Sequence, residues 1–155
     1  MKDALGYIQN MLFQLKISLA DWLTERLEKI DEEYWNTMVL PKLSYYQNQM
    51  IEKERKTKLQ DLDLTCILRI FDKNWYDLSF SYNFKTEIRS YVKELQIMRN
   101  KYAHLASDIP VFEINSDLQI IKSLLNSLNI DNPLQQKIEG LLDLSIKDNK
   151  NEVKQ

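Results

Sequence analysis

Residues 5–30 read LGYIQNMLFQLKISLADWLTERLEKI, and apolar side chains recur there at intervals of three and four positions. That interval puts them on one side of an α-helix, which has about 3.6 residues per turn. They are Leu5, Ile8, Leu12, Leu15, Leu19, Trp22, Leu23, Leu27 and Ile30. Charged and amide side chains fall largely between them, as on an exposed face. We therefore expect one long amphipathic helix that packs its apolar side against the rest of the chain.

The remaining sequence predicts further helices joined by short polar links. We expect them over residues 32–58, 64–75, 83–106, 116–128 and 133–147. Pro41 must kink or divide the first of these regions, or lie in the first turn of a new helix. Residues 107–115, which contain Pro110, predict a loop.

Polar residues at capping positions indicate where these helices begin. The candidate N-caps are Asp61 or Asp63 for the third helix, Asn83 or Thr86 for the fourth, and Asn132, before Pro133, for the last. Ser116 and Gln119 have the spacing of a capping box, in which each side chain bonds the backbone amide of the other residue. The basic run over residues 53–58 is most simply a solvated helix end, and its alternative is a patch that contacts phosphate.

The composition favours a single all-α domain. The chain has 155 residues, of which 44% are hydrophobic and 28% charged, the balance of one globular domain. Its 2 glycines and 3 prolines are too few for a sheet-rich fold with many tight turns. We expect a compact bundle of about five to six helices over residues 1–147 and a flexible polar tail over residues 148–155.

Charge and rare residue types narrow the possible functions. The net charge of −2 means that any nucleic-acid site must be local. The single cysteine, Cys66, excludes an internal disulfide and a cysteine-based zinc cluster, and lies in an apolar run as a small core residue would. The single histidine, His104, means that a site with two imidazoles needs a second copy of the chain. No secretory signal or membrane span is recognisable, so we expect a cytoplasmic protein.

The helix predicted over residues 83–106 carries the candidate chemistry. Its core stripe is Ile88, Tyr91, Val92, Leu95, Met98, Tyr102 and Leu105, and a second stripe holds Arg89, Lys93, Ile97, Asn100 and His104. An imidazole can take or give a proton near neutral pH, and basic groups bind phosphate. A lone histidine near a helix C-terminus is, however, more often a partner of the helix dipole. Arg99 lies about 140° from His104, so it either reaches a cleft between helices or is buried against a carboxylate.

The run Arg99-Asn100-Lys101-Tyr102-Ala103-His104 resembles the motif of the HEPN superfamily. Ribonuclease members of that superfamily carry Arg, a polar residue, and then His four to six positions after the Arg. The surrounding sequence is similar to the Swt-type branch of HEPN domains, in LSYYQ at 43–47, LQDLDLTCILRI at 59–70, NWY at 74–76 and YVKELQ at 91–96. The resemblance covers roughly residues 22–128.

The resemblance implies a helical bundle that commonly dimerises and brings two Arg…His motifs together. Such a site cleaves RNA without a metal or another cofactor, by attack of the ribose 2′-hydroxyl on the adjacent phosphorus. The products end in a 2′,3′-cyclic phosphate and a 5′-hydroxyl. His104 would then transfer protons, Arg99 would stabilise the phosphorane, and Asn100 would position one or both. The basic residues of the same helix are the candidate substrate-binding residues: Arg89, Lys93 and Lys101.

The family also bears on regulation and biological role. HEPN toxins that are silenced by nucleotidylation carry a tyrosine two residues after the histidine, whereas this chain has Ala106, so we do not expect that regulation. Swt-type domains occur attached to helicases, restriction factors and other defence proteins, which implies phage defence or toxin-like growth arrest.

Two functions remain open at this point. The first is a metal-independent endoribonuclease that acts as a homodimer, and the second is a catalytically inactive dimerisation or RNA-binding module of a larger defence or restriction complex. Aromatic residues could form a surface for the second, although such side chains are more often buried: Tyr7, Tyr34, Trp35, Tyr45, Tyr46, Trp75, Tyr76, Phe80 and Tyr82. We expect no metal site, because the acidic residues at 31–33, 61 and 63 favour helix starts instead.

Overall fold

The computed structural model describes residues 4–104, 110–130 and 134–142. Every regular element among them is helical, which confirms the predicted all-α class. The α-helices are α1 (Ala4–Ile30), α2 (Tyr45–Glu54), α3 (Leu64–Lys73), α4 (Trp75–Tyr82), α5 (Glu87–His104) and α6 (Val111–Ser127). Three short turns connect some of them, η1 (Trp35–Val39), η2 (Leu40–Lys42) and η3 (Leu59–Asp61), and residues 134–142 are also helical. The prediction of five to six helices is therefore too low for the described part of the chain.

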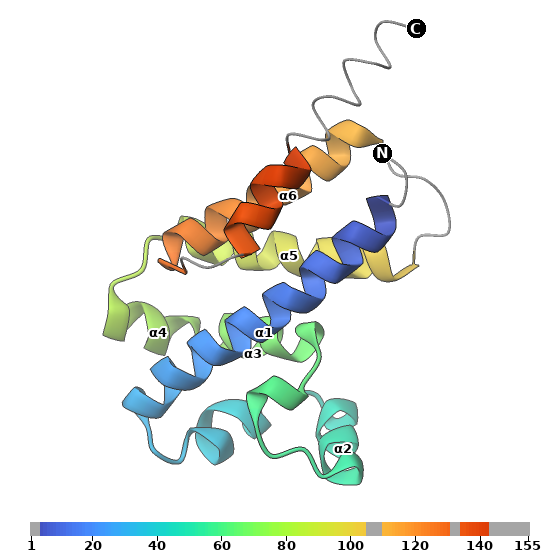
Figure 1. Cartoon of the computed structure of the whole chain (residues 1–155). Helices are drawn as coiled ribbons and strands as arrows, with labels where there is room; N and C mark the ends of the chain where they lie inside the picture. The colour runs from blue at the N-terminus through green and yellow to red at the C-terminus, as the bar shows by residue number, and fades with distance from the viewer. Residues whose placement is uncertain (1–3, 105–109, 131–133, 143–155) are drawn as a thin grey trace, which may run out of the picture.

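The long helix predicted from residues 5–30 is confirmed as α1. It packs against η3, α3, α4 and α5, so that the core lies between α1 and these elements (Figure 1). Four leucines of α1 have no exposed surface: Leu15, Leu19, Leu23 and Leu27. Burial of each such side chain stabilises the fold by about 1.5–3 kcal/mol before the entropy of folding is counted.

Helix α5 lies between α3 and α6 (Figure 1). Its predicted core stripe is confirmed over the described residues, since five of its members are buried and Tyr91 is half-buried. The buried ones are Ile88, Val92, Leu95, Met98 and Tyr102. Two sides of α5 are thus occupied by packing, and the remaining surface is available for function.

The helical region predicted over residues 32–58, which Pro41 had to kink, divide or restart, is divided at two places. Pro41 lies in the first turn of η2, one of the three roles open to it. Ser44 then begins α2 with a capping box that the sequence analysis missed: the Ser44 N–H donates to Gln47 Oε1 at 2.8 Å, and the Gln47 N–H donates to Ser44 Oγ at 3.1 Å. Helix α2 ends where Arg55 adopts a left-handed conformation with φ of 56°. The basic run at 53–58 spans the end of this helix and the residues after it, and it is exposed except at the half-buried Lys56. Its alternative as a patch that contacts phosphate stays a prediction.

The third predicted helix is shorter than its apolar pattern indicates, because it ends at Asn74. That side chain is buried, and its Nδ2 donates to the carbonyl oxygens of Met38 and Ile70, both at 2.8 Å. These bonds separate α3 from α4 and tie the junction to η1. At the other end of α3, Asp63 is the N-cap and accepts from the Cys66 N–H at 2.9 Å, which decides between the two candidate caps.

The predicted loop over residues 107–115 is wrong where it can be tested, at residues 111–115. Helix α6 begins at Val111, and Pro110 is its N-cap in an extended conformation, with ψ of 140° and no side-chain capping bond. Ser116 lies inside this helix and is exposed, so the predicted capping box with Gln119 does not form. Residues 134–142 confirm part of the last predicted helix, while residues 107–109, its predicted cap and the tail at 148–155 lie outside the described residues. No described helix is long and apolar enough to cross a membrane.

Candidate functional site

Helix α5 presents Arg99, Asn100 and His104 near its C-terminal end. Asn100 and His104 are exposed, and Arg99 is half-buried. The C-terminal end of a helix carries partial negative charge, so basic groups there are electrostatically favoured. The question is which of the three side chains the fold brings together.

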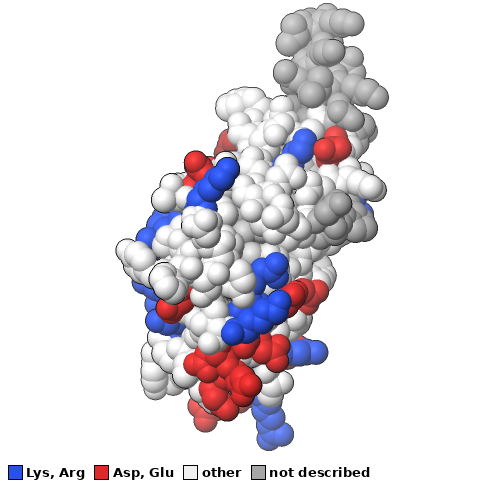
Figure 2. Space-filling view, turned by 90° about the vertical axis from the view of Figure 1, so that its left-hand side faces the viewer, with Lys and Arg blue, Asp and Glu red and all other residues white. Residues whose placement is uncertain are grey.

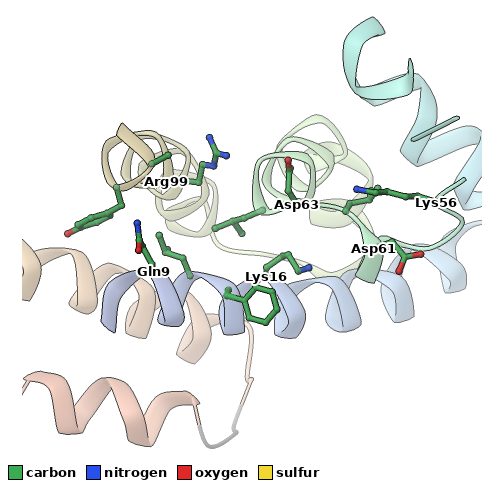
Figure 3. A pocket seen from close by; sticks show the side chains of 12 residues that line it. Gln9, Lys16, Lys56, Asp61, Asp63 and Arg99 are labelled. Atoms are coloured by element: carbon green, nitrogen blue, oxygen red, sulfur yellow. The ribbon is translucent and has the colours of Figure 1, made fainter. Parts of the chain in front are cut away.

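Arg99 lines an open groove between α1, α3 and α5 with a volume of about 370 Å³. The α1 side supplies Gln9, Leu12, Phe13 and Lys16, and the opposite wall includes residues 61–64. Figure 3 shows Arg99 and Gln9 at one end of the groove, Lys16 in its middle, and Asp61 with Lys56 at the other end. Of the two positions predicted for Arg99, the cleft between helices is therefore the one observed.

The Arg99 guanidinium has an amide partner and lacks a carboxylate partner within the described ranges. Its Nη1 donates to Asn100 Oδ1 at 3.4 Å, a long bond between neighbouring residues. No described Asp or Glu lies within ion-pair distance of it. Asn100 thus contacts Arg99, and no described residue neutralises the charge of Arg99.

His104 is on a different face from Arg99. It lines neither this groove nor the smaller pocket on the other side of Arg99. On a regular helix it lies about 40° from Asn100 and about 140° from Arg99. One copy of the chain therefore brings Arg99 and Asn100 together but does not direct His104 to the same point.

The predicted substrate-binding residues Arg89 and Lys93 both contact Asp72 of α3. Arg89 Nε lies 3.1 Å from Asp72 Oδ1, and Lys93 Nζ lies 3.2 Å from Asp72 Oδ2. The Arg89 guanidinium also lies over the Tyr76 ring, 5.5 Å from its centroid. One carboxylate thus serves two cations that remain partly exposed.

Lys101, the third predicted substrate-binding residue, fastens α5 to α6. Its Nζ lies 2.8 Å from Glu113 Oε1 and 2.5 Å from Asp117 Oδ2. Burial acts to lower the pKa of Lys101, but its hydrogen bonds to Asp117 and Glu113 outweigh burial and raise that pKa. The buried Tyr102 hydroxyl donates to the same Asp117 oxygen. These bonds hold the end of α5 that carries the motif.

The charge distribution over the surface matches the low net charge. Figure 2 shows acidic and basic side chains interspersed on one face, with acidic ones gathered at its lower end. That face offers no continuous basic surface to a nucleic acid. On this face, a candidate RNA site would therefore have to rest on a few local cations.

Several residues around Arg99 were missed as site residues by sequence reasoning. Lys16, Phe13 and Gln9 belong to α1, far from Arg99 along the chain, so no spacing pattern links them to it. Arg69 lies on α3 and lines the smaller pocket beside Arg99. Only the packing of the helices reveals these neighbours.

The remaining reactive groups give no sign of a metal or thiol site. No cluster of three His, Cys, Asp or Glu side chains suited to a metal occurs in the part of the chain that is described. Cys66 is buried, and burial raises the pKa of its thiol to about 12, so it is a core residue rather than a nucleophile.

Comparison with known proteins agrees with the motif. The profile of one protein family, Swt1-like HEPN, matches residues 10–129, somewhat more of the chain than the motifs alone indicate. Searches of curated proteins and of solved structures found no significant match. With most of its residues inside that profile, the chain belongs to the Swt1-like HEPN family.

Proposed function

We propose that this chain is a metal-independent endoribonuclease that acts as a homodimer. The observation that carries the proposal is the state of Arg99, a guanidinium at the rim of a groove with Asn100 beside it and no described carboxylate in contact. Family membership supports a ribonuclease-like or RNA-binding module. An uncompensated guanidinium is suited to the negative charge that develops on a phosphorane.

The proposed reaction uses one Arg99 and two imidazoles. A neutral His104 removes the proton from the ribose 2′-hydroxyl, whose oxygen attacks phosphorus while the bond to the 5′-oxygen breaks. A protonated His104 from the partner chain gives its proton to that leaving oxygen. Arg99 stabilises the phosphorane, and Asn100 orients Arg99 through their hydrogen bond. The products are a 2′,3′-cyclic phosphate and a 5′-hydroxyl.

The face of α5 that carries His104 supports the proposed homodimer. Ile97 is seven positions before His104 and therefore on the same face, and it is 69% exposed. Ile97 is about two turns before His104 on the helix, so a second copy that covers Ile97 would also approach His104. Contact between two copies over this face would bring two His104 residues close to each other.

Cleavage of total RNA and tRNA in EDTA tests this function. The wild type should release fragments that end in cyclic phosphate, and His104→Ala at the same dimer content should release none. Ile97→Asp should reduce both dimer content and cleavage without unfolding the chain, as checked by light scattering and circular dichroism. Cleavage that survives in His104→Ala, or that needs a divalent metal, would refute the proposal.

A second candidate function is an inactive dimerisation or RNA-binding module within a larger defence or restriction complex. Five of the aromatic residues considered above are exposed and do not line the Arg99 groove, which favours it: Tyr7, Tyr45, Tyr46, Tyr76 and Phe80. Others of the aromatic residues considered above are at least partly buried, such as Trp75. Binding of RNA without cleavage by intact wild-type dimers would favour this function. Action in phage defence or growth arrest, and a cytoplasmic location, are parts of the proposal in either case.

A further inference from the structure

A second, smaller pocket of about 200 Å³ lies on the other side of Arg99, between α2, α3 and α5. Its polar lining comes from all three helices: Gln47, Thr65, Arg69, Gln96, Arg99 and Asn100. No carboxylate lines it. The groove described above differs, because leucines and Phe13 make up much of its wall and two aspartates, Asp61 and Asp63, also line it.

Two guanidiniums share this pocket without a counter-charge among the described residues. Arg69 is held by a bond from its Nε to the Lys42 carbonyl oxygen at 2.8 Å, which leaves its terminal nitrogens for another partner. Within the described part of the chain, Arg99 has only its long bond to Asn100. Two like charges facing one small space repel each other, and an anion between them removes that repulsion.

The amides of the pocket are arranged as donors. Gln47 Oε1 already accepts from the Ser44 N–H, and Asn100 Oδ1 accepts from Arg99, so each side chain has its NH2 group left to donate. Thr65 adds a hydroxyl oxygen that is buried without a hydrogen-bond partner. A pocket rich in donors and free of acidic groups is complementary to an oxyanion with several acceptor oxygens.

We propose that this pocket binds a phosphate group of the RNA backbone and that Arg69 is a phosphate-binding residue. The proposal rests on the proposed function for the identity of the anion as RNA. Arg99 lines both hollows, so the phosphate next to the scissile bond lies on one side of Arg99. The sugar and base of that nucleotide lie in the more apolar groove on the other side, where Phe13 offers an aromatic face.

Binding of an RNA that cannot be cleaved tests the pocket separately from catalysis. The probe is a fluorescent oligonucleotide with 2′-O-methyl riboses, measured by anisotropy over a series of salt concentrations. Arg69→Gln should weaken binding by about tenfold and lower the salt slope by about one, as expected for a lost phosphate contact. The matched control is Lys73→Gln, which removes one exposed positive charge from the same helix outside the pocket. Equal effects of the two substitutions would overturn the proposal.

Arg69→Gln also removes the bond from Arg69 to Lys42, which could weaken binding through the fold. A second variant separates that structural effect from the loss of the phosphate contact. Gln96→Glu puts a carboxylate into the pocket without touching that bond, and it should weaken binding at least as much as Arg69→Gln. The exposed Gln119 gives the control Gln119→Glu on α6. Unchanged affinity in folded Gln96→Glu would overturn the phosphate pocket, as would a wild type that does not bind the probe.

The two proposals can fail separately. Dependence of binding on Arg69 in a protein that never cleaves RNA would keep the pocket and remove the nuclease. Cleavage of RNA by a wild type whose RNA affinity does not depend on Arg69 would keep the nuclease and rule out the phosphate pocket. Titration with inorganic phosphate, followed by NMR at Arg69 Nε and the Asn100 amide, shows whether a free anion suffices. Shifts with phosphate support the pocket, and no shift with either phosphate or the oligonucleotide overturns it.

Discussion

The cations of α5 fall into two groups that differ in what lies opposite them. Arg89 and Lys93 share Asp72, and Lys101 contacts Glu113 and Asp117. Arg99 contacts an amide and shares a pocket with a second arginine. Acidic residues are not scarce, since the chain has 23 of them against 21 basic ones. The contrast is that Arg89, Lys93 and Lys101 form ion pairs that join α5 to α3 and α6, whereas Arg99 forms none among the described residues, as the proposed phosphate contact requires.

Arg99→Gln should show the largest effect, and the effect should be on catalysis alone. We expect kcat for RNA cleavage to fall by about 10²- to 10³-fold, because the guanidinium that faces the developing charge is lost. The free energy of unfolding should change by less than about 0.5 kcal/mol, because the side chain is partly exposed and has no ion pair among the described residues. A fluorogenic RNA assay and urea unfolding measure the two quantities. A large loss of stability with unchanged kcat would mean that Arg99, like Lys101, serves to hold α5 against its neighbours.

Asp117→Ala should instead lower the stability of the fold. The substitution leaves the buried Tyr102 hydroxyl without its partner and removes one of two carboxylates from Lys101. We expect the free energy of unfolding to fall by about 2–3 kcal/mol, measured by urea or thermal unfolding. Glu113→Ala is the control, because that carboxylate is more exposed and, among the described residues, is ion-paired with Lys101 alone. Its loss should cost less than about 1 kcal/mol. Equal losses in the two variants would contradict a special role for Asp117.

The same contacts predict a loss of stability at alkaline pH. Burial, together with the bond to Asp117, raises the pKa of Tyr102 above its ordinary value of 10.0. The folded chain thus keeps a proton that the unfolded chain releases, so this contribution is complete below pH 10.0 and is lost as the pH rises towards the folded-state pKa. Lys101, whose pKa is also raised, acts in the same direction above 10.5.

Tyr102→Phe tests this pH dependence, because phenylalanine has no proton to lose. Unfolding free energies measured in steps from neutral to alkaline pH should fall less steeply for Tyr102→Phe. The difference in slope should approach about 1.4 kcal/mol per pH unit, the value for one proton. Parallel curves for the variant and the wild type would show that Tyr102 does not control the alkaline transition.

The helices and the core stripes were predictable because they depend on local spacing. The apolar positions of α1 and α5 recur every three to four residues, and the structure buries most of them. The ends of helices were less predictable where two signals compete. Helix α6 begins at Val111, after Pro110, and continues through the cap signal at Ser116. The buried Asn74 ends a helix whose apolar pattern continues.

The candidate site was predictable only in part, for a similar reason. Arg99, Asn100 and His104 follow from a motif of neighbouring residues, whereas the partners that distinguish one cation from another come from elsewhere in the chain. Asp72 pairs with Arg89 and Lys93, and Asp117 pairs with Lys101. No pattern within α5 predicts which of its cations form these ion pairs. Arg69 reaches the site from α3 for the same reason.

Asp72→Asn should have the smallest effect and bears most directly on Arg89 and Lys93. From the sequence, these two cations are proposed as RNA contacts. In the fold, one carboxylate, whose side chain is 12% exposed, partly neutralises both of them. Removing that charge should raise RNA affinity by about threefold at low salt, and the gain should vanish at high salt because exposed charges are screened. Anisotropy with the uncleavable oligonucleotide measures it, with Asp77→Asn as the control on α4. Unchanged affinity in Asp72→Asn would mean that Arg89 and Lys93 serve the packing of α5 on α3 and do not contact RNA.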